Sequence, residues 1–127
     1  MNFWFFMLVM VLLTPLTMML FGCLFYYKPP KNINGVYGYR TKMSRKNQQT
    51  WDFAHEYCGW LWMRLGSVIA PVSLTCMYLL RGKDIDTIGI WGGIIMLVQC
   101  LLLVLTIPIT ERALRKNFDE YGMKKEQ

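Results

Sequence analysis

NGVYGYRTKMSRKNQQTWDFAHE, residues 34–56, is the longest polar stretch in a chain of 127 residues that is otherwise mostly apolar. It separates two long apolar runs, and its last polar side chains, Asp52, His55 and Glu56, continue into the second run. Such groups are costly in hydrocarbon unless they find partners. The stretch therefore predicts a polar structure at the edge of an apolar bundle, and it contains the candidate functional residues.

The composition indicates a membrane protein with a single domain, residues 1–127. Apolar residues make up 54% of the chain and charged residues only 17%, whereas soluble domains average about 25% charged residues. No charged side chain precedes Lys28, and none lies between Asp86 and Glu111. We therefore expect an all-α membrane protein with three transmembrane helices.

The boundaries of the spans follow from the apolar runs. At about 1.5 Å per residue, the first run is long enough to cross a hydrocarbon core of about 30 Å. Lys28-Pro29-Pro30 should end it sharply, because proline lacks an N–H and restricts the preceding residue. The prediction is spans over about residues 3–27, 54–80 and 88–107, a long first loop over 28–50, and a tail over 108–127.

The first loop should be ordered. Asn34-Gly35 and Gly38 favour turns, since glycine accepts positive φ angles. Tyr37 and Tyr39 are unusual in a disordered linker. Loops of this length in small domains are often functional. We expect the loop to fold back against the bundle.

Charged side chains at the start of the second helix need partners. Asp52 and Glu56 are four residues apart on one helical face, where like charges repel, and Arg40 and Lys42 are the candidate counter-charges. Arg64 lies deeper in the same helix. Its guanidinium must snorkel, pair with Glu56 or line a wet cavity.

Two local features predict packing inside the bundle. Pro15 should kink the first span, with its freed carbonyl satisfied by a neighbouring helix or by Thr14. Gly89 and Gly93 form a G-x-x-x-G pair, which permits close helix contact within one protomer or in a homo-oligomer.

After the third span, Pro108 predicts an interruption. Residues 110–121 then have the pattern of an amphipathic helix, with Leu114, Phe118 and Tyr121 on one face. We expect this C-terminal amphipathic helix to be interfacial and to lie along anionic lipid.

The basic residues predict the orientation. The first loop and the tail together hold eleven Lys and Arg residues, against two in the connection at 81–87. Because Lys and Arg concentrate on the cytoplasmic side, the C-terminus should be cytoplasmic and the N-terminus outside, in a multi-pass protein of a plasma membrane. Basic residues that flank apolar spans favour membrane lipids as partners, and no motif indicates nucleic-acid binding.

Cysteine spacing favours neither a disulfide framework nor a zinc site, since the four cysteines lie singly in apolar segments. No cofactor motif is present, and we expect no cofactor. A metal or enzyme site remains an alternative, because Asp52 stands three and four residues before His55 and Glu56, and His55 could act as a general base.

One motif in the first loop is also found in a known family. Gly38-Tyr39-Arg40-Thr41, followed by Ser44, Asn47 and Trp51, comes after PPKNIN at residues 29–34, and TERALRKNFD closes the pattern at residues 110–119. This set resembles the SdpI family of small bacterial membrane proteins, whose pattern would place a small polar residue such as Asn where this chain has His55.

The resemblance implies a function in bacteriocin immunity, that is, toxin resistance against a secreted antimicrobial peptide, or in signalling through a cytoplasmic regulator. It also implies that Asn34, Gly38, Tyr39, Thr41, Asn47 and Trp51 belong to one ligand- or partner-binding site. The residues themselves add Arg40, Asp52, His55, Glu56 and Arg64. The alternatives are a membrane-embedded enzyme or metal-binding protein, a small transporter subunit, and a purely structural role for the polar cluster.

Overall fold

The computed structural model describes residues 2–125, and its secondary structure there consists of three helices apart from one isolated bridge between Phe118 and Lys124. They are α1 (Asn2–Tyr27), α2 (Gln48–Leu79) and α3 (Ile85–Asn117). Each is long and apolar enough to cross a membrane. This confirms an all-α fold with three candidate spans.

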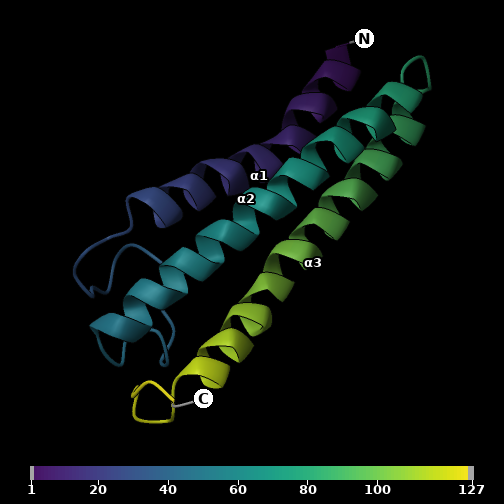
Figure 1. Ribbon diagram of the computed structural model, residues 1–127. Helices are drawn as coiled ribbons and strands as arrows, with labels where there is room; N and C mark the ends of the chain where they lie inside the picture. Colours follow the sequence, from purple (N-terminus) through teal and green to yellow (C-terminus); the bar gives the residue numbers. More distant parts are fainter. Residues whose placement is uncertain (1, 126–127) are drawn as a thin grey trace.

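The helices alternate in direction along the bundle (Figure 1). The first loop (residues 28–47) and the tail (residues 118–125) lie together at one end, which we call the loop end. The N-terminus and the short connection between α2 and α3 lie at the opposite end, which we call the hairpin end. Large exposed apolar side chains cover the outer faces of all three helices, as expected for surfaces in contact with lipid.

Close packing of α1 on α2 depends on three glycines. A Cβ atom on Gly22 would lie 2.9 Å from the Gly59 carbonyl oxygen, and one on Gly59 would lie 2.6 Å from the Gly22 carbonyl oxygen. Farther along, a Cβ on Gly66 would lie 2.9 Å from the Pro15 carbonyl oxygen. The two backbones therefore touch, which is how helices associate in lipid without a hydrophobic driving force between them.

All three helices meet at a buried amide in the middle of the bundle. Pro15 has no N–H, so the carbonyl of Val11, four residues earlier, lacks its helical donor. The Gln99 side chain of α3 donates to that carbonyl and to the Ser73 hydroxyl of α2, at 2.8 Å each. The expected rescue by a neighbouring helix is thus confirmed, and the donor is Gln99.

The structure differs from the sequence prediction after Pro108. The third helix continues through this proline to Asn117, so the segment that follows is the end of α3 and not a separate interfacial helix. Leu114 and Phe118 are buried against the first loop and α2, whereas Tyr121 is 77% exposed. The apolar stripe that indicated lipid contact is therefore largely a contact within the protein.

The G-x-x-x-G pair has little role inside the protomer. Nothing approaches a Cβ built on Gly93, and a Cβ on Gly89 would make only ordinary contact with Phe3 at 3.7 Å. The tight position is the neighbouring Gly92, which packs against Met7. Oligomerisation through Gly89 and Gly93 stays a prediction.

Candidate functional site

The start of α2 is fixed by a reciprocal cap. Asn47 accepts a hydrogen bond from the backbone N–H of Thr50 at 2.9 Å, and the Thr50 hydroxyl accepts one from the Asn47 N–H at 3.1 Å. The Asn47 amide also donates to the Gly122 carbonyl at 2.6 Å. One predicted site residue therefore both starts the helix and binds the tail.

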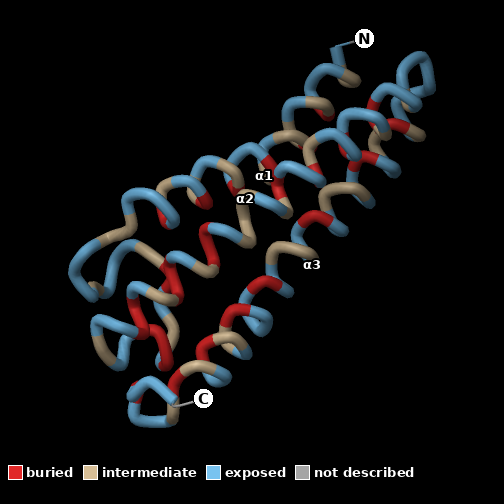
Figure 2. Tube along the Cα trace, viewed as in Figure 1, coloured by how far each residue is buried: buried red, intermediate tan, exposed pale blue. Residues whose placement is uncertain are grey.

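The entry of the first loop is held by Trp51 and Asn34. The Trp51 ring is fully buried, and its N–H donates to the Pro30 carbonyl at 2.7 Å. The Asn34 side chain accepts from the backbone N–H groups of Val36 and Tyr37, an Asx turn that shapes the loop tip. Figure 2 shows the buried positions gathered where the loop meets α2.

His55 fastens the middle of the loop to α2. Its side chain is fully buried, Nε2 accepts the backbone N–H of Tyr39 at 2.8 Å, and Nδ1 lies 2.8 Å from the Trp51 carbonyl. An amide can only donate and a carbonyl can only accept, so this arrangement assigns the neutral tautomer with hydrogen on Nδ1. Phe25 packs edge-on against the ring, with centroids 5.1 Å apart.

Gly38 makes that contact possible. Its φ angle is +117°, and a Cβ atom at this position would lie 2.5 Å from His55 Nε2. The backbone conformation and the close approach of the imidazole both require a residue without a side chain. Tyr39 N–H can then reach the ring.

Glu111 fastens the loop to α3. The hydroxyl groups of Tyr39 and Thr41 lie 3.2 and 3.1 Å from the same Glu111 carboxylate oxygen, with both hydroxyls donating. Burial and the Glu111 charge raise the pKa of the Tyr39 phenol well above its usual range, so the phenol stays a donor. Glu111 was absent from the predicted site residues, although it lies in the TERALRKNFD motif that supported the family resemblance.

The three charged groups expected to pair are instead exposed and separate. Arg40 donates to the Gly35 carbonyl, and Asp52 accepts from the Gln48 amide at 2.8 Å. Glu56 lines a shallow hollow of about 200 Å³ with Tyr57. The predicted arrangement of Arg40 between two helix carboxylates is not formed in residues 2–125.

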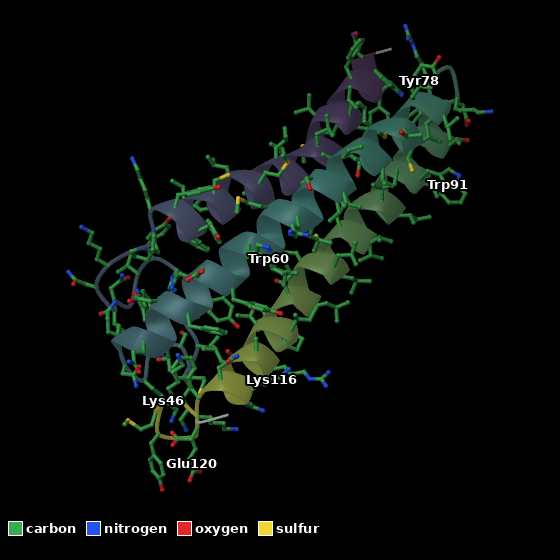
Figure 3. The ribbon with its side chains drawn as sticks, in the orientation of Figure 1. Lys46, Trp60, Tyr78, Trp91, Lys116 and Glu120 are labelled. Atoms are coloured by element: carbon green, nitrogen blue, oxygen red, sulfur yellow. The ribbon has the colours of Figure 1, made fainter. Side chains whose placement is uncertain are left out.

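Arg64 finds a partner within its own helix. Its guanidinium carbon lies 4.6 Å from the centroid of the Trp60 ring, one turn earlier, and the side chain is exposed. Such a cation–π contact partly compensates the charge at a membrane position. Figure 3 labels Trp60 part-way along α2, and its side chain is 39% exposed, so this pair lies apart from the loop contacts.

The alternative metal site is not assembled. Across residues 2–125, no group of three or more His, Cys, Asp or Glu side chains is arranged to hold a metal ion. Both His55 nitrogens are engaged by backbone groups, while Asp52 and Glu56 are exposed. The helix therefore turns the imidazole inward and the two carboxylates outward.

Comparisons with known proteins agree with the loop motif. A model of the SdpI/YfhL protein family matches residues 31–110 of the 127 in the chain. The chain belongs to this family. It is also 36% identical over 98 residues to the uncharacterized protein YfhL of Bacillus subtilis (strain 168), an alignment that covers 77% of this chain and 79% of the relative. No solved structure matches significantly.

Family membership and three candidate spans identify a multi-pass membrane protein. The family match contains every predicted site residue and stops one residue before Glu111. Among the matched residues of the first loop and the start of α2, the buried side chains hold the loop in place, and the exposed side chains form its outer surface. The residues of the family motif therefore mainly fold the first loop onto α2 and α3.

Proposed function

We propose that this protein is an immunity protein of the SdpI type, which protects a bacterial cell against a secreted peptide toxin or signals its presence to a cytoplasmic regulator. The loop end would face the cytoplasm, because eleven Lys and Arg residues of the first loop, the last turns of α3 and the tail oppose two at the hairpin end. Family membership supports this class of function.

The observation that carries the proposal is the double attachment of Tyr39. Its backbone N–H bonds to His55 of α2, and its hydroxyl bonds to Glu111 of α3. A ligand that displaces the first loop must therefore break contacts with both helices. A ligand or partner that binds better to the displaced loop would thereby change the contacts of two membrane spans, which is a route for a signal along the bundle.

The contact surface is assigned to the exposed charges of the loop end. Arg40, Asp52 and Glu56 are exposed, whereas Trp51 and His55 are fully buried. The exposed set is available to a cytoplasmic regulator or to a toxin peptide that reaches the cytoplasmic face, and the buried set holds the loop in place. Substitutions in the two sets should consequently have different effects on folding.

A survival assay tests the proposal. The full chain is expressed in a sensitive bacterium, which is challenged with the peptide fraction of spent medium from Bacillus subtilis, the species of the similar protein YfhL. Cells with the wild-type chain should tolerate a higher dose than vector cells, and Arg40→Ala should lose most of that gain at equal expression. Lys83→Ala, at the hairpin end, is the matched control and should protect fully.

Native mass spectrometry of the same variants in mild detergent identifies what is bound. A peptide retained by the wild-type protein and lost from folded Arg40→Ala protein supports the proposal. Equal survival of vector and wild-type cells contradicts protection, and full protection by Arg40→Ala contradicts the assigned surface.

A further inference from the structure

A pocket at the loop end collects basic side chains from three segments. Lys42 and Lys46 of the first loop, Arg115 of α3 and Lys125 of the tail line a cavity of about 650 Å³, which we call the basic pocket. Figure 3 shows Lys46, Lys116 and Glu120 at this end of the molecule, far from Tyr78 and Trp91. The basic side chains of this pocket are therefore concentrated at the loop end.

Two of the three carboxylates that line the basic pocket accept hydrogen bonds within the protein. One Glu111 oxygen accepts the Tyr39 and Thr41 hydroxyls, and Asp119 accepts the backbone N–H groups of Tyr121 and Met123, both at 2.9 Å. Glu120, the remaining carboxylate, is exposed.

The basic side chains of the pocket have fewer hydrogen-bond partners in the protein than the carboxylates have. Lys125 donates to the Arg115 carbonyl at 2.7 Å. Among residues 2–125, the side chains of Lys42, Lys46 and Arg115 have no hydrogen-bond or ion-pair partner in the protein. The four basic side chains of the pocket outnumber its three carboxylates by one, so the pocket keeps a net positive charge that favours an anion.

The walls of the basic pocket are tied together before any ligand arrives. The bond from Asn47 to the Gly122 carbonyl joins the loop to the tail. The backbone N–H of Lys125 donates to the Asn117 carbonyl at 2.8 Å, which turns the tail back to the end of α3. The basic groups are thus held in one place, and binding costs little ordering of the backbone.

The surroundings place the anion at a membrane surface. A second cavity of about 880 Å³ shares Arg115 and continues along α3 past Arg112 and Lys116 to Ile109 and Tyr57. Tyr121 and Met123, beside the basic pocket, are 77% and 62% exposed, as suits side chains that dip into the interface. Cationic groups thus adjoin apolar surface that continues into the membrane-spanning part of α3.

We propose that the basic pocket binds the phosphate of an anionic phospholipid headgroup. Basic pockets beside transmembrane helices are suited to such headgroups. The shared chemistry is a phosphate monoester or diester, and the adjoining apolar surface favours the lipid over a soluble phosphate. The site does not depend on the immunity function, since the lipid would fix the tail and loop whether or not a peptide binds.

The test is lipid titration of the full chain in mild detergent by native mass spectrometry, with phosphatidylglycerol and phosphatidylcholine as probes. Phosphatidylglycerol should bind more tightly, and Lys42→Gln/Lys46→Gln should weaken it about fivefold for each charge removed. Lys28→Gln/Lys31→Gln is the control, because it removes the same charge from the same loop outside the basic pocket. Arg115→Gln provides a second variant from α3, and thermal unfolding verifies that each variant is folded.

Three outcomes would overturn the proposal. Equal affinity for the two lipids would show that headgroup charge does not determine binding. Equal losses of affinity in the test and control variants would show that the basic pocket is not the binding site. Displacement of phosphatidylglycerol by millimolar glycerol phosphate would assign the pocket to a soluble phosphate. Preference for phosphatidylglycerol, lost only in the pocket variants and resistant to glycerol phosphate, supports the lipid site.

Discussion

At the scale of single residues, Gly38 and His55 depend on each other. The glycine adopts a positive φ angle and leaves room for Nε2 of the imidazole, which in turn accepts the next N–H along the loop. A side chain here would strain the backbone and collide with a ring that both Trp51 and Tyr39 hold in place. The contact is therefore a sensitive test of the loop structure.

Gly38→Ala should lower the free energy of unfolding by about 1–3 kcal/mol, the range for a strained backbone position. Thermal or denaturant unfolding in detergent measures the change. Gly35→Ala is the matched control in the same loop, because its φ is not positive and nothing lies within 4 Å of a Cβ built there. Equal stability of the two variants would contradict the structure of the loop around His55.

At the scale of helices, Gln99 compensates for Pro15. It donates to the Val11 carbonyl that the proline leaves without a partner, and it ties α3 to Ser73 of α2 through the same amide nitrogen. In the hydrocarbon of a membrane, an unpaired carbonyl has no water molecule from which to accept a hydrogen bond. A helix irregularity in α1 is thus repaired by a side chain from α3.

Gln99→Leu should reduce stability by about 1 kcal/mol, the scale of a hydrogen bond between membrane helices. The cost should be smaller in a Pro15→Ala background, where the N–H restored at position 15 can bond to the Val11 carbonyl within α1. Unfolding of the two single variants and the double variant gives the coupling energy. A coupling of zero would mean that Gln99 does not serve the carbonyl freed by Pro15.

At the scale of the whole molecule, the two ends differ in charge and construction. The loop end has an ordered loop, a folded tail and most of the basic residues, whereas the hairpin end has a short connection. Because the chain has three candidate spans, the N-terminus lies on the opposite side of the membrane from the loop end. The positive charge of the loop end favours the cytoplasm.

Cysteine labelling tests this orientation. In a background with the four native cysteines replaced by alanine, Lys83→Cys should react with an impermeant maleimide in intact cells. Lys31→Cys should react only after the membrane is permeabilised. Both positions are exposed, so they differ chiefly in the side they face. Labelling of Lys31→Cys in intact cells, with Lys83→Cys protected, would reverse the proposed orientation.

The sequence by itself determined the three spans and the ordered first loop. Span length, the absence of charge and the proline stop after Tyr27 are local properties, so α1 lies within one residue of the predicted limits. The helix α2 ends one residue before the predicted span but begins at Gln48, six residues earlier than the span predicted at 54–80. The prediction that Pro108 interrupts the third helix was wrong, because a proline inside a long membrane helix does not have to end the helix. The continuation of α3 to Asn117 depends on packing of Leu114 and Phe118 beneath the loop.

Only the tertiary structure decided which candidate residues work together. The sequence offered Arg40 as a counter-charge for Asp52 and Glu56, but an exposed ion pair gains little free energy, and the guanidinium bonds to the Gly35 carbonyl instead. The decisive partners are far apart in the chain: Tyr39 and Glu111 are separated by 72 positions, and Val11 and Gln99 by 88. Local periodicity carries no information about such pairs, because they exist only once three helices pack against one another.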